Sequence, residues 1–123
     1  MPEKNKILVI DDDETIPAII QSFLEPQGYE VSSALDGASG LDRIKNDPPD
    51  VILLDQRMRG LSGIDVLKRL CRDEETGNIP VIMITGDNNL RQLSLSIELG
   101  ASDYILKPLS RECLLTRLHN VIE

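Results

Sequence analysis

The stretch Val51-Ile52-Leu53-Leu54-Asp55 places four apolar residues directly before a single carboxylate. A short apolar run of this kind, led by two β-branched residues and followed by turn-forming glycines, predicts a strand that is buried on both faces of a sheet. The carboxyl ends of parallel strands form the sheet edge at which α/β proteins bind their ligands. Asp55 is therefore the centre of the candidate site.

Three other apolar runs end on polar residues in the same way. Residues 7–10 precede Asp11, Asp12 and Asp13, residues 81–84 precede Thr85, and residues 104–106 precede Lys107. If these runs are parallel strands, their ends meet with Asp55 at one edge of one sheet. The sequence thus predicts that carboxylates, a hydroxyl group and an ammonium group converge there, and three carboxylates form an oxygen site suited to Mg²⁺.

Predicted strands and helices alternate along the whole chain. The strands are expected at 6–10, 29–34, 51–54, 80–84 and 103–106. One helix is expected to be capped by residues 13–15 and to end near residue 25, and the others are expected at 36–45, 64–72, 88–99 and 110–122. This pattern predicts one α/β domain over residues 1–123, with a five-stranded parallel sheet covered by helices on both faces. Because Asp11, Asp12 and Asp55 must share a site, the first and third strands should be neighbours, which favours the doubly wound, flavodoxin-like order 2-1-3-4-5.

The helices differ in how well one face can be buried. The residues expected to face inward from the first three helices are Ile16, Ile19, Ile20, Phe23 and Leu24, then Ala38, Leu41 and Ile44, then Ile64, Leu67, Leu70 and Cys71. Cys71 and Cys113 are both interpreted as packing residues. Helix 88–99 carries one stripe of Leu90, Leu93 and Ile97 and another of Leu95 and Leu99. One sheet cannot bury both stripes, so the surplus is either a partner-binding surface or scattered surface leucine.

The composition argues against several classes of function. The formal net charge is −8 and aromatic residues make up 2% of the chain, so direct nucleic-acid binding lacks both a basic face and stacking platforms. No apolar run approaches the ~18 residues of a membrane span. No apolar signal segment follows Met1, and the expected location is therefore cytoplasmic.

Taken together, these residues resemble the receiver domain of two-component response regulators, the CheY-like domains. The matching stretches are residues 7–14, 51–58, 60–63, 80–86 and 100–108, which cover nearly the whole chain in order. One position departs from the pattern, since the family usually has proline where this chain has Arg59. That difference concerns the loop that follows Asp55 and not the reactive groups.

The resemblance implies a phosphorylation-driven switch. Asp55 would accept a phosphoryl group from a sensor histidine kinase or a histidine phosphotransfer protein, and Thr85 and Lys107 would bind the phosphoryl oxygens. Mg²⁺ would be held by Asp11, Asp12, Asp55 and the backbone carbonyl of Arg57. Tyr104 would be the switch aromatic, and Lys107-Pro108 a cis peptide. The changing surface would comprise helix 88–99, strand 103–106 and helix 110–122, and it would meet a second copy or an output domain.

Such a domain is not an enzyme beyond catalysing its own phosphorylation and dephosphorylation. A haloacid dehalogenase-type phosphohydrolase is an alternative, because Asp11 and Asp13 fit an Asp-x-Asp-x-Thr nucleophile pattern, although a cap domain and a late acidic pair are missing. A flavin-binding domain of the same topology is a second alternative, but it lacks a Ser/Thr-rich phosphate loop. Arg57 and Asp87 are predicted to pair at the mouth of the site and to slow hydrolysis. The sequence leaves open the kinase, the output and whether the chain is part of a longer protein.

Overall fold

Strands and helices alternate along the chain as predicted. The computed structural model describes residues 5–86 and 90–122. The elements are β1 (Lys6–Ile10), α1 (Thr15–Leu24), the 3₁₀ helix η1 (Glu25–Gln27), β2 (Glu30–Ala34), α2 (Gly37–Asn46), β3 (Val51–Asp55), α3 (Gly63–Arg72), β4 (Val81–Thr85), α4 (Leu90–Glu98), β5 (Asp103–Leu106) and α5 (Arg111–Ile122). Most ends lie within one or two residues of the predicted ones. Residues 88 and 89 of the predicted fourth helix lie outside the described residues.

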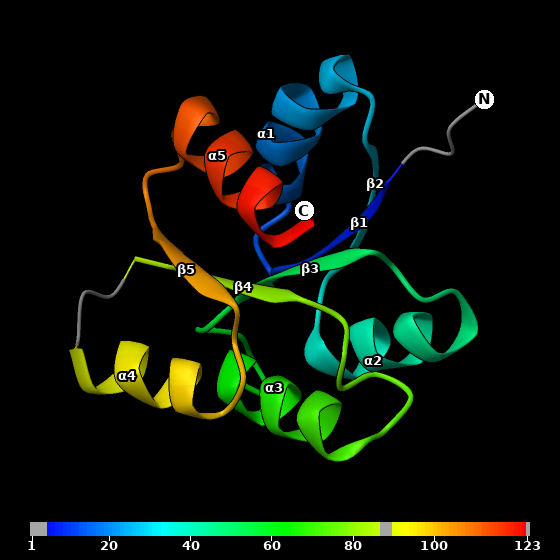
Figure 1. Cartoon of the computed structure of the whole chain (residues 1–123), viewed down its shortest axis with the longest axis vertical. Helices are drawn as coiled ribbons and strands as arrows, with labels where there is room; N and C mark the ends of the chain where they lie inside the picture. The colour runs from blue at the N-terminus through cyan, green and yellow to red at the C-terminus, as the bar shows by residue number, and fades with distance from the viewer. Residues whose placement is uncertain (1–4, 87–89, 123) are drawn as a thin grey trace.

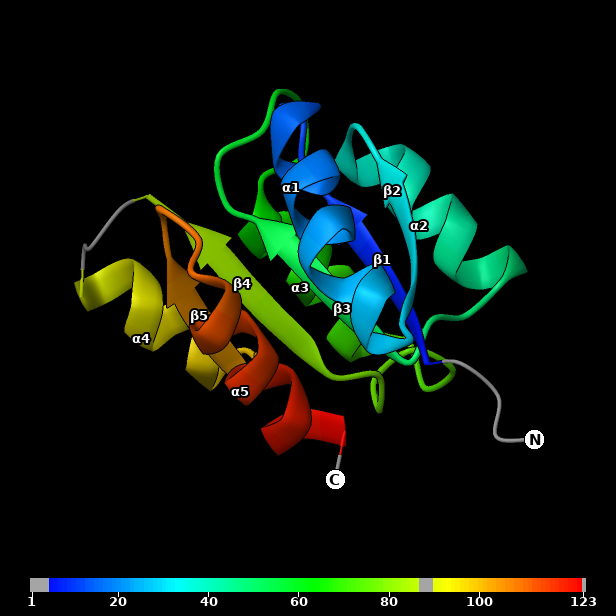
Figure 2. The same ribbon diagram turned by 90° about the horizontal axis from the view of Figure 1, so that it is seen from above.

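The sheet has the predicted topology. Within the described residues, five parallel strands form one sheet in the order β2-β1-β3-β4-β5. Helices α1 and α5 cover one face, and α2, α3 and α4 cover the other (Figure 1). The view from above shows β1 and β3 side by side near the middle of the sheet (Figure 2). The order places the carboxyl ends of β1 and β3 next to each other.

Strand β3 supplies both hydrophobic cores. Ile52 and Leu54 belong to the cluster that contains residues of α2 and α3, whereas Val51 and Leu53 belong to the cluster that contains residues of α1 and α5. All four side chains have 0% exposure. The prediction of a strand buried on both faces is therefore confirmed, and the alternation of side chains along the strand explains it.

The buried face of α2 differs from the predicted one. Ala38 is exposed, and the buried residues are Gly37, Gly40 and Ile44, with Leu41 half-buried. A Cβ atom at Gly40 would overlap the side chain of Ile10, so the helix approaches β1 through Gly40. This close approach turns the helix so that Ala38 faces away from the sheet.

Two further residues expected to face inward are exposed. Ile19 on α1 is exposed, and so is Cys71 at the end of α3, where Val66 is buried instead. The Cys71 thiol donates a hydrogen bond of 2.7 Å to the carbonyl oxygen of Leu99, just after α4. Cys71 therefore contacts the neighbouring segment and not the sheet, while Cys113 is half-buried as expected.

Helix α4 buries little of its apolar surface. Leu93 and Ser96 are its buried residues, whereas Leu90, Leu95 and Ile97 are exposed, Leu90 by 76%. This confirms that one sheet cannot bury both stripes. Among the described residues, no helix combines the length and apolar character that crossing a membrane would require.

Candidate functional site

Three carboxylates meet at the carboxyl edge of the sheet. Asp55 is the last residue of β3, and Asp11 and Asp12 directly follow β1, which pairs with β3 through Ile10 and Leu54. Asp11 and Asp55 are buried, with 2% and 6% exposure, and Asp12 is half-buried. One carboxylate oxygen from each of the three lies within 4.8 Å of the others.

Asp13 is not part of this carboxylate cluster, although it lines the same cavity. Its carboxylate accepts hydrogen bonds from the Thr15 side-chain hydroxyl (2.7 Å) and backbone N–H (3.0 Å) at the start of α1. The hydroxyl bond, followed by the backbone bond, lowers the pKa of Asp13. The Asp13 backbone N–H in turn donates to Asp11 Oδ1 at 2.9 Å. The N-cap position of α1 is Glu14, so Asp13 lies one residue before the expected cap and bonds to Thr15, the first residue of the helix. Its backbone N–H helps to hold Asp11 in place.

Lys107 reaches the carboxylates from the end of β5. Its backbone N–H donates to the carbonyl oxygen of Thr85 at 2.8 Å, which joins the ends of β5 and β4. Its Nζ atom lies 3.2 Å from Asp55 Oδ1 and 3.4 Å from Asp11 Oδ2. The Lys107-Pro108 peptide is cis, as the resemblance implied.

The charges at the site are strongly coupled. Burial, and then the nearby charge of Asp11, raise the pKa of Asp55 to about 6, although Lys107 acts in the other direction. Burial of Lys107 works to lower its own pKa, but the carboxylates of Asp55 and Asp11 outweigh it and raise that pKa. One ammonium group therefore faces two buried carboxylates and a third nearby, and the excess of negative charge favours a cation.

The remaining predicted groups line the same cavity, apart from Tyr104. Thr85 is buried at the end of β4. The cavity has a volume of about 410 Å³ and is lined by Asp11, Asp12, Asp13, Asp55, Arg57, Thr85, Gly86 and Lys107. Tyr104 is half-buried in β5 and packs against the cluster that contains residues of α2 and α3. Asp87 lies outside the described residues, so its pairing with Arg57 stays a prediction.

The donor set fits a hard divalent cation. Three carboxylates within reach of one point provide the oxygen ligands that Mg²⁺ and Ca²⁺ prefer, and no soft ligand lines the cavity among the described residues. The carboxylates come from two neighbouring strand ends, which a buried sheet holds in place. The cluster is therefore a candidate site for a metal ion.

Sequence reasoning missed Gln56, which links the site to two helices. Its Oε1 atom accepts a hydrogen bond from the Ile64 backbone N–H (2.9 Å), and its Nε2 atom donates to Gln92 Oε1 on α4 (3.4 Å). Gly63 allows this close packing, because a Cβ atom there would overlap the carbonyl oxygen of Asp55. The available signal was an amide side chain placed directly after the buried carboxylate.

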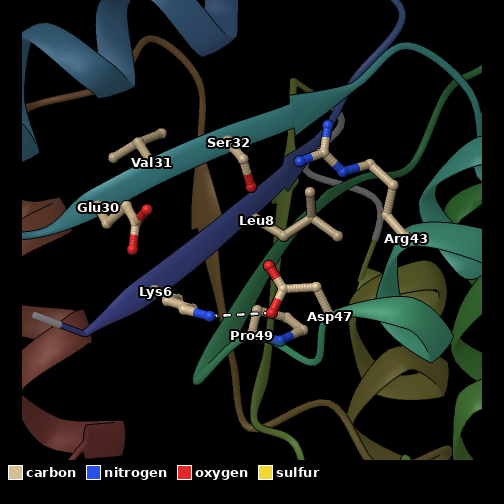
Figure 3. A pocket seen from close by; sticks show the side chains of 8 residues that line it. All are labelled: Lys6, Leu8, Glu30, Val31, Ser32, Arg43, Asp47 and Pro49. Carbon is tan, nitrogen blue, oxygen red and sulfur yellow. Dashed lines mark hydrogen bonds and ion pairs between the residues drawn. The ribbon is translucent and has the colours of Figure 1, made fainter. Parts of the chain in front are cut away.

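A second hollow lies at the opposite end of the sheet, between β1, β2 and the end of α2 (Figure 3). It has a volume of about 100 Å³, and Lys6 Nζ and Asp47 Oδ1 form an exposed ion pair of 2.9 Å in it. Water screens such a pair, and the lining mixes both signs of charge. This hollow is much smaller than the cavity at the carboxyl edge, and it does not gather charges of one sign.

Comparisons with known proteins agree with this geometry. The family model described as the response regulator receiver domain matches residues 7–119. The transcriptional regulatory protein CseB of Streptomyces coelicolor is 36% identical over 99% of this chain and 51% of its own length. The DNA-binding dual master transcriptional regulator RpaA of Synechocystis is 37% identical over 95% of this chain and 48% of its own length. The chain thus spans about half the length of these curated relatives.

Solved structures show the same likeness. A putative response regulator from Chloroflexus aurantiacus superposes with a TM-score of 0.93 at 29% identity, covering 98% of each chain. The family match gives no support to the haloacid dehalogenase alternative.

Proposed function

The chain belongs to the response regulator receiver domain family, and from this premise we propose that the Asp55 carboxylate accepts a phosphoryl group. The donor is a phosphohistidine of a sensor histidine kinase or of a histidine phosphotransfer protein. The observation that carries the proposal is the placement of Asp55, a buried carboxylate beside two further acids and 3.2 Å from Lys107 Nζ. This arrangement puts one nucleophile between a candidate cation site and an ammonium group.

Each group at the edge has a part in the transfer. A carboxylate oxygen of Asp55 attacks phosphorus as the phosphorus–nitrogen bond of the donor breaks, which leaves the histidine nitrogen with the electron pair. The Thr85 hydroxyl and the Lys107 ammonium donate hydrogen bonds to the phosphoryl oxygens. Asp11, Asp12, Asp55 and the backbone carbonyl of Arg57 would hold Mg²⁺, which would offset the charge of the carboxylates and of the phosphoryl group.

Phosphorylation then changes the surface formed by α4, β5 and α5. Thr85 and Lys107 move toward the phosphoryl group, and Tyr104 turns inward behind Thr85. The exposed leucines of α4 make this surface able to bind a second copy or an output domain. The domain acts as a switch, and its own chemistry is limited to the gain and loss of its phosphoryl group.

The charge of the domain and its relatives support a proposal about where it acts and what it contacts. The net charge of −8 disfavours direct contact of this domain with nucleic acid, so a DNA-binding output of the kind named for RpaA would belong to another part of a longer protein. We place the domain in the cytoplasm without membrane contact, where a sensor kinase presents its phosphohistidine.

Labelling with a small phosphodonor tests the acceptor. Incubation with Mg²⁺ and acetyl phosphate should add one base-labile phosphoryl group, which intact-mass spectrometry detects. Asp55→Asn should abolish the label, whereas Asp13→Asn should keep it, because the Asp13 carboxylate bonds to Thr15 at the start of α1 and is not part of the carboxylate cluster. Equal labelling of Asp55→Asn and the wild type would refute the assignment.

Amide hydrogen exchange tests the switch. Phosphorylation should change exchange in α4 more than in α1, because a ligand shifts a conformational equilibrium only through contacts that differ between the two states. Mass spectrometry of peptic fragments before and after labelling measures both helices in one experiment. A uniform change, or none, would count against a switch located at α4.

A further inference from the structure

The backbone amide of Arg59 contacts the candidate metal site. Its N–H group donates a hydrogen bond of 3.2 Å to Asp12 Oδ2, across 47 positions of sequence. Arg59 lies in the loop between β3 and α3, and Figure 2 shows this loop beside the start of α1. The bond therefore joins the two strand ends that supply the carboxylates.

Each of the three carboxylates accepts at least one hydrogen bond. Lys107 Nζ donates a hydrogen bond to both Asp55 and Asp11, and the backbone N–H of Asp13 also donates to Asp11. The backbone N–H of Arg59 donates to Asp12. Asp12 is the most exposed of the three, so its side chain has the most rotational freedom to lose when it binds a cation.

This donor depends on the residue type at position 59 in one respect only. Any residue except proline has a backbone N–H, and proline, which the receiver pattern usually has at this position, has none. The arginine side chain is exposed and is not part of the bond. The departure from the pattern therefore adds a hydrogen-bond donor at the metal site.

We propose that the Arg59 amide is a positioning group that holds Asp12 in the orientation in which it binds a divalent cation. The bond to Oδ2 leaves Oδ1 available to the cation and fixes the carboxylate before binding. This inference rests on the proposed Mg²⁺ site of the proposed function. Donors that orient metal ligands typically change metal affinity about 10–100-fold when removed, and one exposed amide should act at the lower end.

Mg²⁺ affinity of two matched variants tests the proposal. Arg59→Ala and Arg59→Pro both remove the guanidinium charge, but only Arg59→Pro removes the N–H. Isothermal titration calorimetry should give Arg59→Pro a dissociation constant about tenfold higher than that of Arg59→Ala. Arg59→Ala should bind at least as tightly as the wild type, because it keeps the donor and loses a positive charge near the cation.

Two further variants separate this inference from the proposed function. Asp12→Ala should bind Mg²⁺ much more weakly than the wild type, whereas Asp13→Ala should bind nearly normally. If the wild type binds no Mg²⁺, the proposed metal site and this inference both fail. If the wild type binds and Asp12→Ala does not, equal affinities of Arg59→Pro and Arg59→Ala overturn only the inference.

Amide exchange in the wild-type background keeps the test valid if Arg59→Pro folds poorly. By nuclear magnetic resonance, the Arg59 amide should exchange slowly in the wild type and faster in Asp12→Ala, both without metal. It should stay protected when Mg²⁺ is added. Loss of protection on adding Mg²⁺ would mean that the cation displaces the donor, which would overturn the proposal.

Discussion

Two neighbouring parts of the molecule follow opposite rules of burial. The frame is defined as residues 51–54 of β3 together with α3. Most of its apolar side chains are buried, and Ser62 and Asp65 cap the start of α3 by bonding to each other's backbone N–H groups. In the edge region, defined as the three carboxylates and α4, Asp11 and Asp55 are buried, whereas Leu90, Leu95 and Ile97 are exposed. The frame is arranged for stability, and the edge region departs from that arrangement.

The difference indicates which part of the fold phosphorylation could move. Frame residues lose many contacts if they move, so they hold the strand end that carries Asp55. The polar links of α4 to the rest of the fold include the Gln56–Gln92 hydrogen bond near its start and the Cys71–Leu99 bond just after its end. Departures from the ordinary rules of packing concentrate at functional sites, and here they coincide with the site and one helix.

The strongest test of the comparison removes one buried leucine from each part. Leu67→Ala in α3 should lower the free energy of unfolding by about 3–4 kcal/mol, because its side chain has 0% exposure and leaves a cavity. Leu93→Ala in α4 should cost about 1–2 kcal/mol, because its side chain is 7% exposed and belongs to neither hydrophobic core cluster. Urea unfolding measures both, and equal losses would break the comparison.

Removal of the buried charge of Asp55 should raise the free energy of unfolding instead of lowering it. The pKa of Asp55 is raised to about 6 from its ordinary 3.8, so the folded protein holds this proton more tightly than the unfolded chain does. Its contribution to stability is complete below about pH 4 and is lost as the pH rises through about 6.

Asp55→Asn should therefore stabilise the metal-free protein at pH 7 by about 1–3 kcal/mol and have little effect near pH 4. Urea unfolding of both proteins with a chelator, between these pH values, gives the difference. A difference that does not change with pH would contradict the buried-charge explanation.

The cap of α3 should have a smaller effect. Ser62 Oγ accepts from the Asp65 N–H at 3.2 Å, and Asp65 accepts from the Ser62 N–H at 3.1 Å. Ser62→Ala should cost about 1 kcal/mol of stability. The matched control is Ser94→Ala on the exposed face of α4, which should change stability by less than about 0.5 kcal/mol. A control as costly as Ser62→Ala would mean that the cap contributes nothing specific.

The smallest effect concerns the link between the two parts. Gln92→Ala removes the hydrogen bond to Gln56 but leaves the bond between Gln56 and the Ile64 amide intact. It should cost about 0.5 kcal/mol, seen as roughly twofold faster amide exchange within α4 and unchanged exchange within α3. Faster exchange in both helices would mean that the frame and the edge region open together.

Several features of the fold were predictable because they depend on local patterns. Apolar runs that end on Asp11, Asp55 and Thr85 identify strands and their polar ends without knowledge of the rest of the chain. Parallel strands in the predicted order then bring those ends to one edge. Errors arose on helices, where Ala38 and Cys71 were expected inside and are exposed. Helical periodicity gives the spacing of a buried face, but how a helix rotates against the sheet depends on its neighbours.

The sequence by itself determined the order of elements and the set of polar groups that line the cavity at the carboxyl edge, because both follow from alternation and spacing along the chain. Only the tertiary structure decided which groups touch. Lys107 Nζ reaches Asp55 and Asp11, and the Arg59 amide reaches Asp12, across separations of 52, 96 and 47 residues. Such contacts depend on the packing of several elements at once, to within the few tenths of an ångström that separate a hydrogen bond from its absence.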